Sequence, residues 1–210
     1  AVCSWAAGDP QIHSDAISGR FETAEGSSAL IVLCASHHEP LVFPAREHSE
    51  RRLEATTDFW RSWAEDRAYD GPWHDAVIRS ALALKLLFYA PSGAIAAAAT
   101  ASLPEDIGGE RNWDYRFCWI RDSAFTLEAL LHLGCPGEAT AFFWWLLHAS
   151  HLTHPQLRVL YRLDGGQHAP ERTLGLRGHR DSVPVRVGNE AATQTQLDIY
   201  GSLLQAALTY

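Results

Sequence analysis

The sequence predicts a mainly α-helical fold that follows a short β segment at the N-terminus. Strand-like apolar runs joined by turn-forming residues occupy the first 45 residues. From Ser49 the spacing of apolar residues becomes helical, and the later helical segments are joined by connections that alternate between short and long. Short connections make antiparallel neighbours, whereas long connections at one end of a set of helices are where a site is built.

The β segment is expected to contain three short strands, at residues 17–23, 29–34 and 41–43. A turn around Gly26 joins the first two strands. Three short strands cannot by themselves bury both faces of a sheet. We therefore expect residues 1–47 to be the end of a larger β domain.

Two helices are expected next. The first begins at Ser49, a suitable N-cap, and continues through residue 66. The second follows a Gly-Pro break and runs to Tyr89. Because Lys85 is the only charged residue in positions 81–90, we expect this helix to be buried on most sides.

Three further helices are expected beyond residue 119. One covers residues 120–133 and ends at Gly134, the next covers residues 138–151, and the last begins at Asn189. The predicted core stripe of the middle helix is Ala139, Phe142, Phe143, Leu146 and Leu147. One side of the last helix carries Leu197, Tyr200, Leu204 and Ala207. Residues 91–119 and 153–188 are expected to be long connections without regular structure, which are usually functional.

Composition narrows the class of protein. A net charge of −8 opposes non-specific binding to nucleic acid or to an acidic membrane surface. The four cysteines are scattered without a C-x-x-C pair, so we expect reduced thiols in a cytoplasmic protein. We expect no membrane span, because the apolar runs are too short. The chain contains no methionine and stops within a helical pattern, so we expect it to be a piece of a longer protein.

The motifs for several common chemistries are missing from the sequence. His148, His151 and His154 are spaced by three, but the first and last point away from each other on a helix, and no H-E-x-x-H occurs. The sequence also lacks G-x-S-x-G, P-loop and G-x-G-x-x-G patterns. We therefore expect neither a metal site nor a cofactor.

The stretch GGERNWDYRFCWIRDS at residues 108–123 is too charged for a helical core and too aromatic for a solvated loop. Aromatic faces can stack on the C–H surface of a sugar, and ionised side chains make strong hydrogen bonds to its hydroxyls. Trp113, Tyr115 and Trp119 can supply the faces, and Arg121 with Asp122 the hydroxyl contacts. The residues alone leave a second interpretation open, in which Asp122 caps a helix, Arg121 pairs with an acid and the aromatic residues are core.

Residues 102–134, SLPEDIGGERNWDYRFCWIRDSAFTLEALLHLG, resemble the most characteristic segment of glycoside hydrolase family fifteen, the glucoamylase and bacterial or archaeal trehalase family. Residues 56–105 and 160–206 are similar to its linker, first barrel helix and later loops. The resemblance implies that residues 1–47 end a β-sandwich, residues 48–70 form a helical linker, and residues 71–210 form the first part of an (α/α)6 barrel.

The same resemblance implies an inverting α-glucosidase that acts on trehalose, a maltooligosaccharide or a related glucan. By motif, Tyr115, Trp119, Arg121 and Asp122 would line the subsite for the non-reducing glucose, and Arg177 would touch substrate from the second long loop. The family uses a pair of glutamates as general acid and base, and we expect both beyond Tyr210.

Three hypotheses follow. The first is a piece of an inverting α-glucosidase, inactive as the isolated chain. The second is a non-catalytic sugar-binding or regulatory protein that keeps the glucose subsite, and the third is a helical scaffold. The sequence does not fix the α-glucoside or the oligomeric state.

Overall fold

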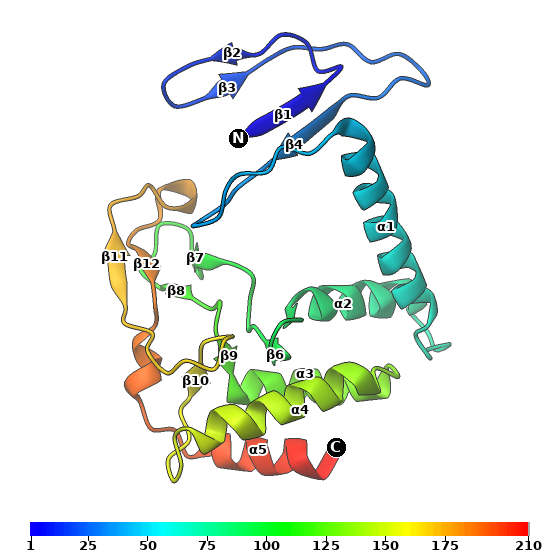
Figure 1. Cartoon of the computed structure of the whole chain (residues 1–210). Helices are drawn as coiled ribbons and strands as arrows, with labels where there is room; N and C mark the ends of the chain where they lie inside the picture. Colours follow the sequence, from blue (N-terminus) through cyan, green and yellow to red (C-terminus); the bar gives the residue numbers. More distant parts are fainter. Residues whose placement is uncertain (210) are drawn as a thin grey trace. The chain divides into compact units, whose positions relative to one another are not determined.

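The computed structural model describes residues 1–209, which contain five α-helices and twelve short strands. These elements form two compact units, residues 1–63 and residues 64 onward. The chain is therefore mixed, with helices and short strands (Figure 1). No helix among the described residues is both long enough and apolar enough to cross a membrane.

The first unit opens with two antiparallel strand pairs, and it corrects part of the strand prediction. Their members are β1 (Val2–Trp5) with β4 (Leu30–Leu33), and β2 (Gln11–Ile12) with β3 (Ile17–Ser18). The strand expected at residues 29–34 is confirmed as β4, but the one expected at 17–23 is reduced to two residues. The strand expected at 41–43 is wrong, because Pro40 and Pro44 flank it and cannot donate to a ladder.

The unit closes with α1 (Arg46–Glu65), which begins three residues before the expected N-cap. Ser49 lies inside the helix, and its hydroxyl donates to the Ala45 carbonyl at 3.1 Å, a bond typical of helix interiors rather than caps. Arg46 pairs with Glu50 at 2.8 Å across one helical turn. This local pair supports the early start of the helix.

The second unit begins with α2 (His74–Leu86), which is shorter and more exposed than predicted. The residues that were expected to extend it form β5 (Phe88–Tyr89), which pairs with β6 (Ala94–Ile95). Burial on most sides is wrong, since Ala81 is fully buried but Leu86 is 67% exposed. Only one face of α2 is covered, and there Lys85 bonds to Glu138 at 2.7 Å.

The next two helices confirm their predictions. These are α3 (Ile120–His132) and α4 (Pro136–His151). Gly134 has a φ of +73°. Its N–H donates to Leu131, and the Cys135 N–H donates to Leu130, which is the bonding of a Schellman C-cap. The buried residues of α4 include Ala139, Phe142 and Leu146 from the predicted stripe, whereas Leu147 is 40% exposed.

The last helix starts later than expected. Asn189 caps only a 3-10 turn, residues 190–193, by accepting the Ala191 N–H at 3.0 Å. The helix itself, α5, spans Asp198–Thr209. It packs against α3, as α4 does (Figure 1). Its core face is Ile199 and Ala206, while Leu197 and Leu204 are 81% and 71% exposed.

The two long connections contain short strands, so the expectation that they lack regular structure is wrong. The strands are β7 (Ala101–Pro104) with β8 (Asn112–Asp114), β9 (Cys118–Trp119) with β10 (Leu160–Tyr161), and β11 (Arg172–Leu174) with β12 (Val185–Val187). Strand β12 packs against β7 and β8, so the second connection lies against the first. These long-range pairings hold the candidate residues in place.

Candidate functional site

The candidate sugar-binding residues lie along the strands and the first helical turn that follow residue 111. Their positions are Trp113 in β8, Tyr115 just after it, Trp119 in β9, and Arg121 and Asp122 in the first turn of α3. Arg177 lies apart, in the connection between β11 and β12. Five of the six therefore lie within residues 113–122 of the sequence, and only Arg177 comes from another segment.

A buried carboxylate fixes the shape of that segment. Asp114 is 1% exposed and accepts bonds from the Arg116 guanidinium at 2.8 and 2.9 Å and from the Gly188 N–H at 3.0 Å. The Asn189 side chain donates to the Asp114 carbonyl at 3.1 Å. Burial disfavours the charged carboxylate, but the bonds from Arg116 and Gly188 outweigh it and hold the pKa of Asp114 below its ordinary value.

The aromatic part of the candidate site is made by Tyr115 and Trp119. Their ring centroids lie 6.1 Å apart at an interplanar angle of 52°. Trp119 packs against the cluster that contains Val159 and Leu160, and its indole N–H is buried with no hydrogen-bond partner among the described residues. Partial burial, and next the negative charges of Glu105 and Asp122, raise the pKa of Tyr115. The phenol thus stays protonated and can donate to a hydroxyl.

Arg121 is held from one side. Its Nη1 donates to Asp198 Oδ2 at 2.7 Å and to Gln196 Oε1 at 3.4 Å. Its Nε and Nη2 have no hydrogen-bond acceptor among residues 1–209. The guanidinium is about half exposed, so these N–H groups remain available to a ligand.

Asp122 is exposed, and no described side chain or backbone group donates to its carboxylate. The residue at the N-cap position of α3 is Trp119, and no side chain caps that end. The interpretation of Asp122 as a helix cap is therefore wrong, while the pairing of Arg121 with an acid is confirmed. Adjacent helical side chains diverge by about 100°, so Arg121 and Asp122 do not neutralise each other.

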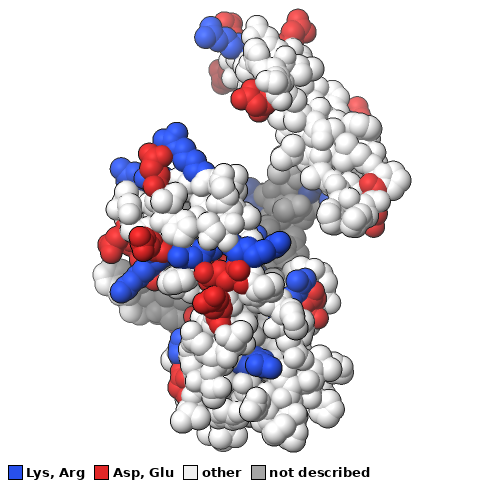
Figure 2. Space-filling model, turned by 90° about the vertical axis from the view of Figure 1, so that its left-hand side faces the viewer, with Lys and Arg blue, Asp and Glu red and all other residues white. Residues whose placement is uncertain are grey.

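Trp113 and Arg177 have other contacts. The Arg186 guanidinium lies over the Trp113 ring, 4.7 Å from its centroid, and it also bonds to Glu171 at 3.0 Å. Arg177 pairs with Asp181, and both side chains are largely exposed. Figure 2 shows acidic and basic side chains interspersed on the face of the second unit that carries β11 and β12. In the described structure Arg177 is not in contact with the other candidates.

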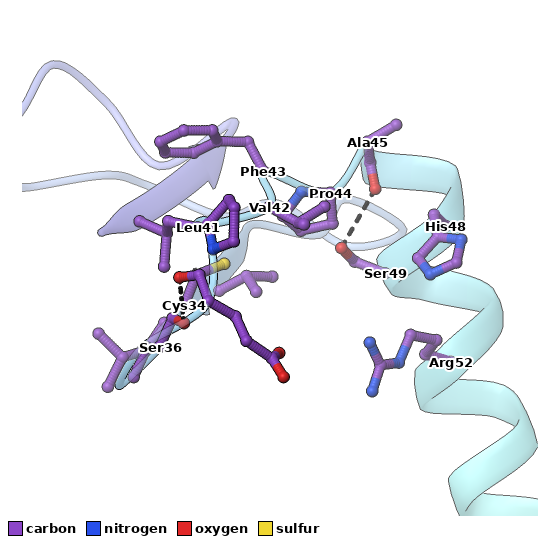
Figure 3. A pocket seen from close by; sticks show the side chains of 15 residues that line it. Cys34, Ser36, Leu41, Val42, Phe43, Pro44, Ala45, His48, Ser49 and Arg52 are labelled. Atoms are coloured by element: carbon purple, nitrogen blue, oxygen red, sulfur yellow. Dashed lines mark hydrogen bonds between the residues drawn. The ribbon is translucent and has the colours of Figure 1, made fainter.

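Two hollows lie outside this group of residues. A pocket of about 360 Å³ is lined by the Asp114–Arg116 and Arg162–Asp164 pairs together with Tyr89. A larger hollow of about 790 Å³ lies in the first unit, between the loop that contains Phe43 and the start of α1 (Figure 3). Its lining is mostly apolar, and Phe43 points along the loop away from α1. None of the six candidate residues lines either hollow.

The described side chains that could bind a metal or act as a thiol nucleophile are not arranged to do so. His148, His151 and His154 are exposed, and no cluster of three potential metal ligands occurs among the described residues. Cys118 is fully buried, and burial raises the pKa of its thiol to about 12. A thiol with that pKa is not a nucleophile near neutral pH.

Comparison with known protein families gives a match over most of the chain. The family described as glycosyl hydrolases family 15 matches residues 71–210, which is more than half of the chain. The chain belongs to glycosyl hydrolase family 15.

The family 15 chain is similar in sequence to several curated trehalases. It is 48% identical over 180 residues to the trehalase of Thermoplasma acidophilum, covering 86% of this chain and 30% of that protein. It is 46% identical over 196 residues to the trehalase of Thermoplasma volcanium, covering 92% and 31%. For the trehalase of Mycobacterium tuberculosis the identity is 40% over 193 residues, covering 89% and 28%. The chain thus spans about 30% of the length of these relatives, and no solved structure matches it.

The structure adds residues to this candidate site that the sequence did not indicate. Asp198 and Gln196 bind Arg121, and Asp114 fixes the backbone that carries the aromatic residues. The Arg121–Asp198 and Asp114–Gly188 contacts each join residues more than 70 positions apart, so no local pattern identifies them. The sequence prediction began the last helix at Asn189, so it gave no reason to single out Asp198.

Proposed function

We propose that the full-length protein containing this chain is a trehalase-type glycosidase that hydrolyses an α-glucosidic bond, with trehalose as the favoured substrate. The observation that carries this proposal is the joint position of Tyr115, Trp119 and Asp122, with Arg121 on the same helical turn. The membership in family 15 and the trehalase relatives support the class of substrate.

The proposed subsite binds the non-reducing glucose. Tyr115 and Trp119 offer aromatic surface to the C–H face of the ring. Asp122 accepts from sugar hydroxyls, and the Nε and Nη2 groups of Arg121 donate to them. Bonds to ionised groups are about twice as strong as neutral ones, so this pair supplies most of the orientation. Trp113 and Arg177 are assigned to the outer wall of the site, where their contacts with Arg186 and Asp181 would rearrange.

For the fold, we assign residues 71–210 to the first part of an (α/α)6 barrel, residues 48–70 to a linker and residues 1–47 to the end of a β-sandwich. The family match begins at residue 71, which supports the start of the barrel. The contacts of α3 with α4 and α5 are those expected of neighbouring barrel helices. We also propose a cytoplasmic location, from the scattered spacing of the four cysteines in the sequence.

The proposed mechanism is inversion by two glutamates that lie outside this chain. The trehalase relatives are much longer than the stretch matched here, which supports a catalytic centre completed by other segments. In an inverting enzyme the two carboxyl groups stand about 6.5–9.5 Å apart, leaving room for the attacking water. The present residues would bind and orient the glucose, and they would not transfer the proton.

A glucose-release assay on the complete gene product tests the proposal. Trehalose, maltose and a longer maltooligosaccharide are compared, and trehalose is expected to be hydrolysed with the highest kcat/KM. Activity only on maltooligosaccharides would support the assignment as a glycosidase and reject the assignment as a trehalase. Binding of millimolar trehalose without hydrolysis would favour the sugar-binding alternative, provided that Asp122→Ala abolishes it. Unchanged turnover in Arg121→Ala, with reduced stability, would favour the scaffold.

A further inference from the structure

The guanidinium of Arg121 is held by residues from a distant part of the sequence. Its Nη1 contacts Asp198 Oδ2 at 2.7 Å, and Asp198 is the first residue of α5. Gln196 supplies a second acceptor at 3.4 Å. Gln196 is itself fixed, since its amide donates to Gln194 at 3.0 Å. The guanidinium is thus held by residues just before and at the start of α5.

The surroundings of Arg121 make such a partner necessary for its orientation. Arg121 lies in the first turn of α3, at the end of the helix dipole that is unfavourable for a cation. Asp122 is adjacent but faces another direction. Asp198 supplies a negative charge next to the Arg121 guanidinium at this end of α3.

Only one edge of the guanidinium is used by this contact. Asp198 and Gln196 both bind Nη1, which leaves Nε and Nη2 on the other edge. That edge can donate to two neighbouring oxygens of a sugar in the planar geometry that arginine favours. One edge of the guanidinium is therefore held by Asp198 and Gln196, and the other edge is available to bind a sugar.

Stability is a poor explanation for this ion pair. The side chains of Arg121 and Asp198 are 44% and 49% exposed. Ion pairs with that degree of exposure contribute little to folding. The pair matters for where the guanidinium points, because a small displacement of an orienting group can lower a rate far more than it lowers stability.

We propose that Asp198 is a positioning residue, which holds Arg121 in the orientation that binds the glucose hydroxyls. This inference rests on the proposed function. Gln196 supports the same orientation with a weaker contact. Asp198 does not touch the substrate and acts only through Arg121.

The test uses the full-length protein and four variants with trehalose as substrate: Asp198→Asn, Asp198→Glu, Arg121→Ala and the double variant Arg121→Ala/Asp198→Asn. Asp198→Asn keeps the size of the side chain and removes its charge. It should lower kcat/KM by about 10- to 100-fold with a melting temperature close to that of the wild type. Asp198→Glu should recover part of the loss, because the charge returns. In the Arg121→Ala background, Asp198→Asn should have no further effect.

A matched control is Glu50→Gln, which removes one carboxylate from an exposed ion pair with Arg46 in the first unit. It should leave kcat/KM unchanged. Gln196→Ala should give a smaller loss than Asp198→Asn.

The outcomes separate this inference from the proposed function. If the wild type hydrolyses no α-glucoside, both are rejected. If the wild type is active and Arg121→Ala is impaired while Asp198→Asn is not, only the positioning role is rejected. An equal loss from Asp198→Asn with and without Arg121 would show an independent role for Asp198, and a loss of the folded state in Asp198→Asn would show a structural one. Either result overturns the inference.

Discussion

The carboxylate of Asp114 accepts a hydrogen bond from the backbone N–H of Gly188 at 3.0 Å, across 74 residues of sequence. Asp114 is 1% exposed and lies between Trp113 and Tyr115. The bond therefore joins the segment that carries the aromatic candidates to the second long connection. The two connections stabilise each other's conformation, because polar groups in each one find their hydrogen-bond partners in the other.

Asp114→Asn should destabilise the folded protein. The amide has one acceptor oxygen where the carboxylate has two, so in either orientation its NH2 group faces Arg116 or Gly188 donors that a carboxylate oxygen accepts. Since the Arg116 side chain is about half exposed, the unpaired cation can be solvated, and we expect a loss of about 1–3 kcal/mol. Urea denaturation of the full-length protein measures it. The control Asp164→Asn, in an exposed pair with Arg162, should cost less than about 1 kcal/mol.

The same carboxylate predicts an acid dependence. Its pKa in the folded protein is lower than the ordinary value of 3.8, so the unfolded chain takes up the proton first as pH falls. The stabilisation is complete above pH 3.8 and is lost as pH falls through the folded pKa. In Asp114→Asn this part of the acid dependence should be missing. An identical slope of unfolding free energy against pH below 3.8 in both proteins would contradict this reading.

Gly188→Ala should be more harmful than an ordinary glycine substitution. Gly188 has a φ of +81°, and an added Cβ would lie 2.0 Å from the Pro170 carbonyl oxygen. Gly165 has a φ of +86° but no atom within 4 Å of such a Cβ. We expect Gly165→Ala to cost about 1 kcal/mol from the backbone conformation alone, and Gly188→Ala several times as much. Equal melting temperatures for the two variants would show that the clash is relieved.

Asp122→Asn should reduce activity without reducing stability. Its carboxylate is exposed and has no donor among the described residues, so folding does not depend on it. Loss of charge-assisted bonds to the sugar should lower kcat/KM by about 10- to 100-fold, corresponding to roughly 1.5–3 kcal/mol. Asp58→Asn, an exposed helical aspartate in the first unit, is the matched control. Wild-type kinetics in Asp122→Asn would show that Asp122 does not bind the substrate.

Cys118 should resist alkylation in the folded protein. It has no exposed surface, and burial raises its pKa to about 12, so almost no thiolate forms at pH 8. Treatment with iodoacetamide at that pH should leave Cys118 unmodified until denaturant is added. Peptide mass spectrometry reads out each cysteine separately. Rapid modification of Cys118 under native conditions would mean that β9 opens readily.

The elements that the sequence predicted well are those set by local signals. The end of α3 followed from Gly134 and is confirmed, and α4 was predicted from residue 138 and begins two residues earlier, at Pro136. The later start of α5 and its core face were not predicted, because packing against α3 selects Ile199 rather than Leu197. The strands in the long connections also depend on distant partners.

In the candidate site, too, the sequence predicted features set by local signals and missed contacts between distant residues. The motif indicated which side chains to consider, and Tyr115 and Trp119 do lie together. The motif did not indicate that Asp198 binds Arg121 or that Asp114 fixes the backbone, since both contacts join residues more than 70 positions apart. Arg177, proposed from its loop, pairs with Asp181 in the described structure.

The most direct test of the central claim is the anomeric form of the glucose released from α,α-trehalose by the full-length protein, followed by proton NMR before mutarotation. An inverting trehalase should release one α-glucose and one β-glucose per bond cleaved. Release of α-glucose alone would contradict inversion, and no release of glucose from trehalose would contradict the proposed activity.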